Sequence, residues 1–302
     1  MMSNSILRIR VLATLVIVAY HCACPYYMWQ WTGYGGDAKE VKLVVDLVFL
    51  RILSNTMLPT FFLISGMLFY TYKEHYSDRL KTLWKKFDRL IIPYCLITTF
   101  VLGLGLNKIG VSSADGHLWF VRDLFIMFAI SLLCYQVKEW KMMVVGVLTY
   151  VLYIIKSKTG IETNEIVEHL LNYYIFFIGG GIVATKYYLL RKKAIAVVLT
   201  IVWLLTLIIG IQTLYVIFFN LMLLAWVSDK KVENKILLSI NRCSFGIYLL
   251  HHVFIFAAFY IPFMYRLYAN DAILAFASMF LMSLSVSWLT THLLHKIQFR
   301  YF

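Results

Sequence analysis

The chain contains ten apolar runs, most of them near 20 residues long, and their spacing most constrains its fold. A helix needs about 20 predominantly apolar residues to cross the hydrocarbon core of a bilayer. The segments between the runs are too short to fold alone. We therefore predict an all-α, polytopic membrane protein of about ten transmembrane helices, forming a single domain over residues 1–302. The runs are 7–24, 47–70, 90–107, 118–137, 142–155, 166–184, 194–210, 212–227, 243–262 and 272–294.

The composition excludes two other classes of protein. Of the 302 residues, 62% are hydrophobic and only 14% are charged, so too few charges are present to cover a folded body in water. The formal net charge of +13 would suggest nucleic acid as a partner in a soluble protein. Here it raises the question of which side of a bilayer the charges occupy. We expect membrane lipids, and no nucleic acid, as partners.

The distribution of charge predicts the orientation. If the N-terminus is cytoplasmic, the inside segments carry 20 Lys/Arg and 6 Asp/Glu, whereas the outside segments carry 6 of each. Cytoplasmic loops of membrane proteins are enriched in Lys and Arg. The pattern therefore predicts that both termini are cytoplasmic.

Five charges fall inside or at the edge of the apolar runs. Such residues are costly when they face lipid and usually face a cavity or a partner. Snorkelling toward the interface is the alternative for Asp46 and Glu168. A role in a cavity is favoured for the adjacent pair that lies one turn into the fourth run. The five are Asp46, Arg51, Arg122, Asp123 and Glu168.

The first run carries two polar side chains in helical register. Arg10 lies at its cytoplasmic edge and His21 follows eleven residues later. Eleven residues at about 100° each come within about 20° of three full turns, so both share one face, with His21 about 16 Å further along. An imidazole at that depth suits general-base work on a hydroxyl. The alternative is a histidine that only hydrogen-bonds a neighbouring helix, and the arginine in register weakens it.

Four ordered patterns carry a family resemblance. The Arg10-x10-His21 spacing resembles a signature of the membrane acyltransferase 3 family. Residues 61–66 (FFLISG), 118–125 (LWFVRDLF) and 244–251 (SFGIYLLH) resemble three further segments of that family. Each is weak alone in an apolar chain, whereas the ordered set is specific. Relatives often have arginine where this chain has Lys86, which keeps the charge but loses the bidentate fork.

The resemblance implies an integral-membrane O-acyltransferase of the stand-alone type in a bacterial plasma membrane. It implies acetyl-CoA, or another acyl-CoA, as the donor and a hydroxyl of a cell-surface or lipid-linked glycan as the acceptor, with no permanently bound cofactor. His21 is then the general base or an acyl relay, and Arg10 orients the donor. Arg122, paired with Asp123, lines the cavity and stabilises the developing oxyanion.

Further residues are candidates for binding substrate or donor. Arg89 and Lys86 are expected to hold donor phosphates. The Ser65-Gly66 pair allows close approach of either a ligand or a helix. Positions 244, 248 and 251 form one polar stripe that lines a substrate path or bonds neighbouring helices, while His252 is expected to point elsewhere. The full candidate set is Arg89, Lys86, Ser65, Trp119, Ser244, Tyr248 and His251.

Two other classes of function are alternatives, and one of them, a membrane scaffold with no turnover, is disfavoured because buried charges are costly. Ten spans, buried arginines and a central histidine also suit a transporter or flippase for a glycan or a small acyl-bearing molecule. No internal repeat supports that alternative. The five cysteines show no zinc-like spacing, so no metal is predicted. The sequence gives no indication of the oligomeric state.

Overall fold

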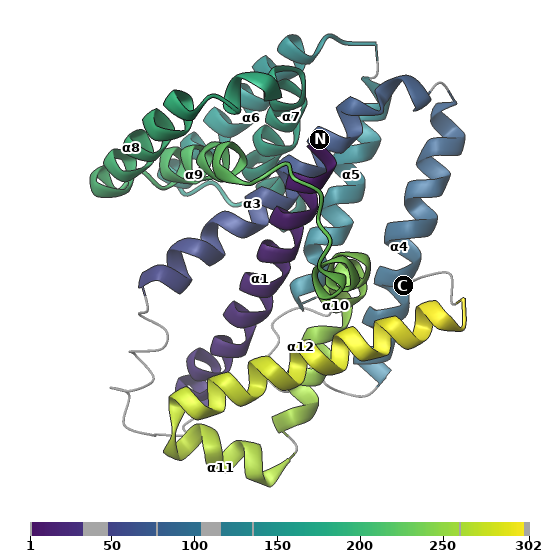
Figure 1. The fold of residues 1–302 in the computed structure, drawn as a ribbon, viewed down its shortest axis with the longest axis vertical. Helices are drawn as coiled ribbons and strands as arrows, with labels where there is room; N and C mark the ends of the chain where they lie inside the picture. Colours follow the sequence, from purple (N-terminus) through teal and green to yellow (C-terminus); the bar gives the residue numbers. More distant parts are fainter. Residues whose placement is uncertain are drawn as a thin grey trace. The chain divides into compact units, whose positions relative to one another are not determined.

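A computed structural model describes residues 2–32, 48–76, 78–103, 116–134, 136–259 and 261–298. Within these ranges the chain is all-α, with no strand. Short 3-10 helices η1 (Lys73–Tyr76) and η3 (Gly116–Leu118) precede α4 and α5. The α-helices in Figure 1 are α1 (Met2–Thr32), α3 (Val48–Thr71), α4 (Arg79–Gly103), α5 (Trp119–Leu133), α6 (Glu139–Thr159), α7 (Glu165–Leu190), α8 (Lys193–Ile209), α9 (Gln212–Trp226), α10 (Lys235–Phe259), α11 (Pro262–Asn270) and α12 (Ala272–Lys296).

Where the structure describes them, the ten apolar runs each lie mainly on one of the long helices, and the short α11 falls in the connection before the tenth run. The gap of 71–89 between the second and third runs is helical over its basic part, because α4 already begins at Arg79. The side chain of Asp78 accepts a hydrogen bond from the backbone N–H of Lys81 (2.9 Å), which is the geometry of a helix N-cap. The basic residues therefore lie on the first turns of a helix.

Small and polar residues set other helix ends. Gly160 is the C-cap of α6 and Gly210 is the C-cap of α8, and both glycines have the left-handed conformation (φ 69° and 79°) that other residues adopt with difficulty. The side chain of Asp271 caps α12 by accepting from the backbone N–H of Leu274 (2.9 Å). Because Gly210 turns the chain within two residues, the seventh and eighth apolar runs share almost no loop.

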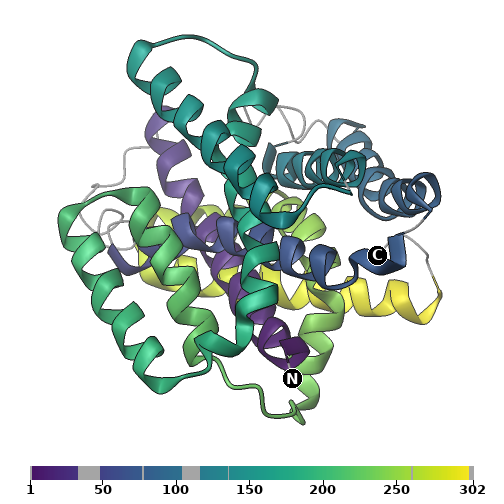
Figure 2. The same ribbon diagram turned by 90° about the horizontal axis from the view of Figure 1, so that it is seen from above.

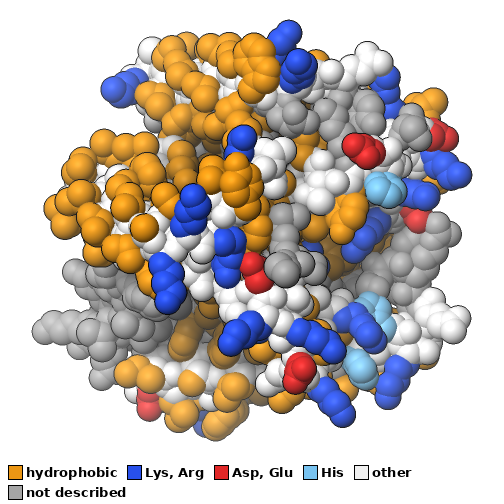
Figure 3. Space-filling model, turned by 45° about the horizontal axis from the view of Figure 1, so that its top comes forward, with side chains coloured by type: hydrophobic (Ala, Val, Ile, Leu, Met, Phe, Trp, Pro, Cys, Tyr) orange, Lys and Arg blue, Asp and Glu red, His pale blue; other side chains and the backbone are white. Residues whose placement is uncertain are grey.

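The exposed side chains confirm membrane character. Among the described residues, four helical stretches are long and apolar enough to cross a membrane, namely Asn4–Cys22, Trp140–Thr159, Glu165–Leu190 and Ile273–Lys296, and α8 and α9 are shorter apolar helices. Large apolar residues of α8 are exposed, with Ile208 at 82%. Figure 3 shows broad patches of such side chains on one face, with Lys and Arg between them. A surface of this kind is stable in lipid and not in water.

The chain divides into two compact units, which are described separately. The first unit comprises residues 1–9, 58–91 and 120–231, and the second comprises 10–57, 92–119 and 232–302. In the first unit α6 packs on α7, α8 packs on α9, and α7 contacts both α8 and α9 (Figures 1 and 2). In the second unit α10 packs on α12, and α11 contacts both.

Glycines bring two helices of the first unit into close contact. A Cβ atom added at Gly66 of α3 would lie 1.7 Å from the backbone oxygen of Phe177 on α7. One added at Gly180 would lie 2.2 Å from the backbone oxygen of Leu63. No side chain fits at either position, so the helices touch backbone to backbone. Helix packing, one of the two interpretations of the Ser65-Gly66 pair, therefore accounts for Gly66.

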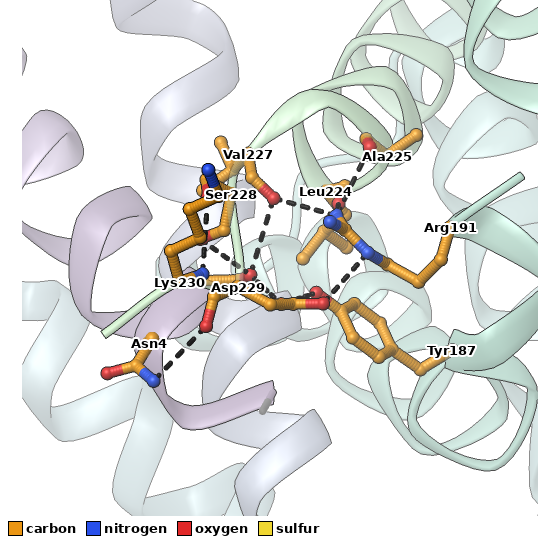
Figure 4. A network of polar contacts seen from close by, with 10 residues as sticks. Asn4, Tyr187, Arg191, Leu224, Ala225, Val227, Ser228, Asp229 and Lys230 are labelled. Atoms are coloured by element: carbon orange, nitrogen blue, oxygen red, sulfur yellow. Dashed lines mark hydrogen bonds and ion pairs between the residues drawn. The ribbon is translucent and has the colours of Figure 1, made fainter. Parts of the chain in front are cut away.

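A polar network in the first unit joins three segments that are distant in sequence (Figure 4). The carboxylate of Asp229, between α9 and α10, pairs with the Arg191 guanidinium (Nε–Oδ2 2.8 Å). The hydroxyl of Tyr187 donates to the same carboxylate (2.8 Å), as does the hydroxyl of Ser5. The side chain of Asn4 donates to the backbone oxygen of Asp229 (3.3 Å). The start of α1, the end of α7 and the segment after α9 are thereby held together.

The second unit has an apolar core with small residues at its helix contact. Cys22 and Cys243 are fully buried there, with Ile247 and Met279. A Cβ atom added at Gly246 of α10 would lie 2.4 Å from the side chain of Thr291 on α12, so these helices also approach closely.

Candidate active site

Four imidazole rings gather in the second compact unit. His21 comes from α1, His117 from η3, and His251 and His252 are neighbours on α10. The ring centroid of His21 lies 5.0 Å from that of His251 and 4.2 Å from that of His252. The ring of His117 stacks on that of His252 at 4.0 Å. We call this group the histidine cluster.

Two members of the histidine cluster were not expected from the sequence. His252 was predicted to point elsewhere, and that prediction was wrong, because its ring stands edge-on against His21. Neighbouring helix positions are only about 100° apart, so a ring placed between the two directions contacts both side chains. His117 was not singled out from the sequence, because it gives no signal beyond its place just before the 118–125 segment.

The hydrogen bonds of the cluster fix its tautomers. The Nδ1 atom of His251 lies 3.0 Å from the backbone oxygen of Ile247, one turn earlier. A carbonyl oxygen only accepts, so Nδ1 of His251 carries the proton and its Nε2 is an acceptor in the neutral ring. That Nε2 atom lies 2.8 Å from Nδ1 of His21, which must therefore donate. Neutral His21 is left with a proton on Nδ1 and a lone pair on Nε2, the form that a general base needs.

Two hydrogen bonds with Tyr248 fix the position of His117. The Nε2–H group of His117 donates to the backbone oxygen of Tyr248 (2.9 Å), and the Tyr248 hydroxyl donates to the backbone oxygen of His117. Ser244, the third residue of the predicted stripe, instead donates to the backbone oxygen of Asn241 in its own helix (2.9 Å). The structure thus brings Tyr248 and His251 to the cluster and directs the Ser244 hydroxyl to its own backbone.

Arg10 and Trp119 belong to the same compact unit as the histidine cluster. Arg10 lies eleven residues before His21 on the continuous helix α1, as the sequence requires for a shared face, and is half-buried. Trp119 is the first residue of α5, two positions after His117, and is also half-buried. The roles of both in binding remain predictions.

The predicted pair of Arg122 and Asp123 forms in the first compact unit. The buried carboxylate of Asp123 accepts from Nε of Arg122 (2.9 Å) and from Nδ1 of His169 on α7 (2.7 Å). His169 was not singled out from the sequence, because nothing in α7 alone indicates that it faces α5. Glu168, one of the five charges within the runs, pairs with Lys156 (2.5 Å). Asp46 lies outside the described residues, as does the Arg51 side chain.

The basic start of α4 supplies two further predicted site residues, also in the first unit. Arg89 is exposed, whereas Lys86 places its ammonium 4.1 Å from the ring centroid of Phe128. Burial, with a smaller contribution from the charge of Arg89, lowers the pKa of Lys86 to about 8. An ammonium on an aromatic face is stabilised by the ring quadrupole. Ser65, on α3 of the same unit, is half-buried. Donor or substrate binding by these three residues stays a prediction.

The comparison with protein families shows the family of the chain. A model described as an acyltransferase domain, that of the acyltransferase 3 family, matches residues 4–292. The chain belongs to the acyltransferase 3 family. The match covers most of both compact units, and it includes the histidine cluster and the Arg122–Asp123–His169 group. No curated protein and no solved structure matches the chain.

Proposed function

We propose that the protein is an integral-membrane O-acyltransferase. In this proposal it moves an acyl group, with acetyl as the favoured one, from cytoplasmic acyl-CoA to a hydroxyl of a cell-surface or lipid-linked glycan. Family membership supports the acyltransferase class. The observation that carries the proposal is the relay from His21 to His251 to the backbone oxygen of Ile247, because it prepares His21 as a base.

The relay supports one balanced step. Nε2 of His21 takes the proton of the acceptor hydroxyl as its oxygen attacks the thioester carbonyl carbon, forming the new C–O bond. The C–S bond then breaks, and the leaving thiolate of CoA takes the proton from Nε2. His251 keeps His21 in the correct tautomer and accepts a hydrogen bond from it while the imidazolium exists, much as the third member of a catalytic triad does. In this scheme the donor is consumed and no resident cofactor is required.

We further propose ten transmembrane helices with both termini in the cytoplasm of a bacterial cell. The charge asymmetry supports this orientation. The polar network around Asp229 supports it too, since Ser5, Tyr187 and Asp229 come from three segments that the charge pattern assigns to the same side. Arg10 then lies near the cytoplasmic edge, where it orients the acyl-CoA donor. Arg89 and Lys86 are proposed to contact donor phosphates.

The proposal is tested by measuring where the labelled acyl group of the donor is transferred. Membrane vesicles that contain the protein receive radiolabelled acetyl-CoA on the cytoplasmic face, and label is measured in protein, glycan and lumen. Transfer to glycan that disappears in His21→Ala supports the proposal. His292→Ala is the matched control, because His292 lies on α12 of the same unit and contacts Trp288 rather than the cluster. Transfer retained in His21→Ala overturns the assignment, and accumulation of an intact solute in the lumen without transfer favours transport.

A further inference from the structure

The histidine cluster has the composition and spacing of a metal site. His21, His251 and His252 each offer one nitrogen, and the three nitrogens lie within 4.8 Å of one another. His251 is buried, and the other two are half-buried, so the group is enclosed but reachable. We propose that these three histidines bind one late first-row divalent metal ion, for which Zn²⁺ is the probe, and that the bound ion blocks the base.

The histidine nitrogens need to move only slightly to reach the distances of a tetrahedral metal site. Zn²⁺ binds histidine nitrogens at about 2.0–2.1 Å, which places two nitrogens of a tetrahedral site about 3.3 Å apart. The hydrogen-bonded nitrogens of His21 and His251 are 2.8 Å apart and need to separate by only about 0.5 Å. The most distant nitrogens of the group need to close by about 1.5 Å at most, which small ring rotations supply.

A second contact favours His251 as a ligand. Histidines that bind a metal through one nitrogen usually donate from the other to a carbonyl or carboxylate oxygen, which fixes the ring and its tautomer. Nδ1 of His251 already does so to the backbone oxygen of Ile247 (3.0 Å), so its Nε2 lone pair is fixed in direction. The ion would take the position of the proton that now lies between His251 and His21.

The ligand chemistry selects the class of metal. Three neutral imidazoles and no carboxylate suit Zn²⁺, Cu²⁺ or Ni²⁺, whereas Mg²⁺ and Ca²⁺ prefer oxygen ligands. Three protein ligands leave the fourth position of a tetrahedral ion for water. His117 forms one wall of the site instead of a fourth ligand, because its Nε2–H is held by the backbone oxygen of Tyr248 and its ring stacks on His252.

The bound ion has a defined effect on the base, and this consequence rests on the proposed function. A metal on Nδ1 of His21 occupies the lone pair there, so the ring proton moves to Nε2. Nε2 then lacks the lone pair that takes the proton of the acceptor hydroxyl. Zinc is therefore expected to inhibit acyl transfer rather than assist it.

Metal content tests the site directly. Purified full-length protein is loaded with Zn²⁺, desalted and analysed for bound zinc, and zinc affinity is measured by titration. Wild type is expected to hold one ion per chain, and His252→Ala is expected to lose about tenfold or more in affinity. His117→Ala is the matched control and should keep the ion. Failure of wild type to bind, or equal binding by His252→Ala, overturns the proposal.

A spectroscopic measurement tests the metal site independently, and it is combined with a check that each variant is folded. Co²⁺ in a tetrahedral site of three imidazoles and water absorbs visible light, so wild type and His117→Ala should show this band and His252→Ala should not. Each variant is accepted only if it elutes as a single symmetric peak with the melting temperature of wild type. A band of equal strength in a well-folded His252→Ala protein would place the ion elsewhere and overturn the site.

The inhibitory consequence is measured separately as the ratio of rates with and without zinc for each protein. A ratio that falls at least about tenfold for wild type, but not for His252→Ala, supports the consequence; unchanged or increased transfer in zinc-loaded wild type overturns it. Bound zinc is counted whether or not the chain transfers acyl groups. Failure of the metal site and failure of the proposed function therefore give different results.

Discussion

Nδ1 of His21 on α1 and Nε2 of His251 on α10 lie 2.8 Å apart, although 230 positions separate them in the chain. Because the backbone oxygen of Ile247 holds the other nitrogen of His251, the direction of this hydrogen bond is determined. The contact turns a histidine that sequence spacing placed on a helix face into one with a defined protonation pattern.

His251 is therefore expected to act as a positioning residue for His21. His251→Ala should lower the rate of acyl transfer about a hundredfold, because His21 then populates both tautomers. His251→Gln should recover part of the loss, since its amide oxygen can accept from Nδ1–H of His21. The double variant His21→Ala/His251→Ala should be no slower than His21→Ala, because residues that act as a unit are not additive. Additive losses would contradict a shared role.

Parts of the candidate site follow from the sequence, and the reason differs from residue to residue. The register of Arg10 and His21 depends only on a continuous helix, so their spacing predicted it. The Arg122–Asp123 pair is formed by sequence neighbours, so it could also be predicted from the sequence. His252 and His117 were missed because their positions depend on how α10 is rotated and where η3 arrives, which are set by packing between distant segments.

The ten apolar runs predicted the long helices for a similar reason. Hydrophobicity over about 20 residues is a property of each segment alone, so it locates the helices without knowledge of their neighbours. The third run, 90–107, does not indicate where α4 begins, because charged residues at the edge of a run resemble a loop, whereas the cap formed by Asp78 extends the helix back to Arg79. Each of the two compact units is assembled from segments that are not contiguous in the sequence, so no local pattern in the sequence indicates which segments pack together.

The close contact of α3 and α7 gives a prediction about stability. Gly66→Ala should destabilise the protein by about 3 kcal/mol, because the added Cβ would overlap the backbone oxygen of Phe177, and backbone cannot rotate away. Gly179→Ala is the control, since nothing lies within 4 Å of a Cβ there, and alanine is the better helix former. Melting temperatures in detergent should fall for Gly66→Ala and stay level or rise for Gly179→Ala. Equal melting temperatures would argue against the backbone contact.

The buried carboxylate of Asp123 should stabilise the first unit strongly. Asp123→Ala leaves the Arg122 guanidinium and the His169 ring without their shared acceptor, and removing one partner of a buried pair typically costs about 3–5 kcal/mol. Glu165→Gln is the comparison, because its carboxylate is half exposed and lies 4.0 Å from Arg122. That change should cost less than about 1 kcal/mol. Similar melting temperatures for the two variants would contradict the assigned network.

Lys86 should make stability depend on pH in one direction. Burial lowers its pKa from 10.5 to about 8, so below pH 8 the folded protein holds a charge that burial disfavours. Between pH 8 and 10.5 the unfolded chain binds more protons at this position than the folded chain, and stability therefore rises with pH there. Lys86→Met, which has no charge, should lack this rise. At pH 7 the variant should be the more stable protein by about 1–2 kcal/mol, after the contact with the Phe128 ring offsets part of the burial cost.

The measurement for Lys86 is the difference in melting temperature between wild type and Lys86→Met at pH 7 and at pH 9.5. The advantage of the variant should shrink as pH rises, because wild-type Lys86 becomes neutral in the folded state. Lys85→Met is the matched control for replacing a lysine by methionine, since Lys85 is exposed one position earlier on the same helix, and its effect on the melting temperature is measured at the same two pH values. An advantage of Lys86→Met that grows with pH would reverse the sign of the linkage and show that the ammonium is stabilised, rather than disfavoured, where it lies.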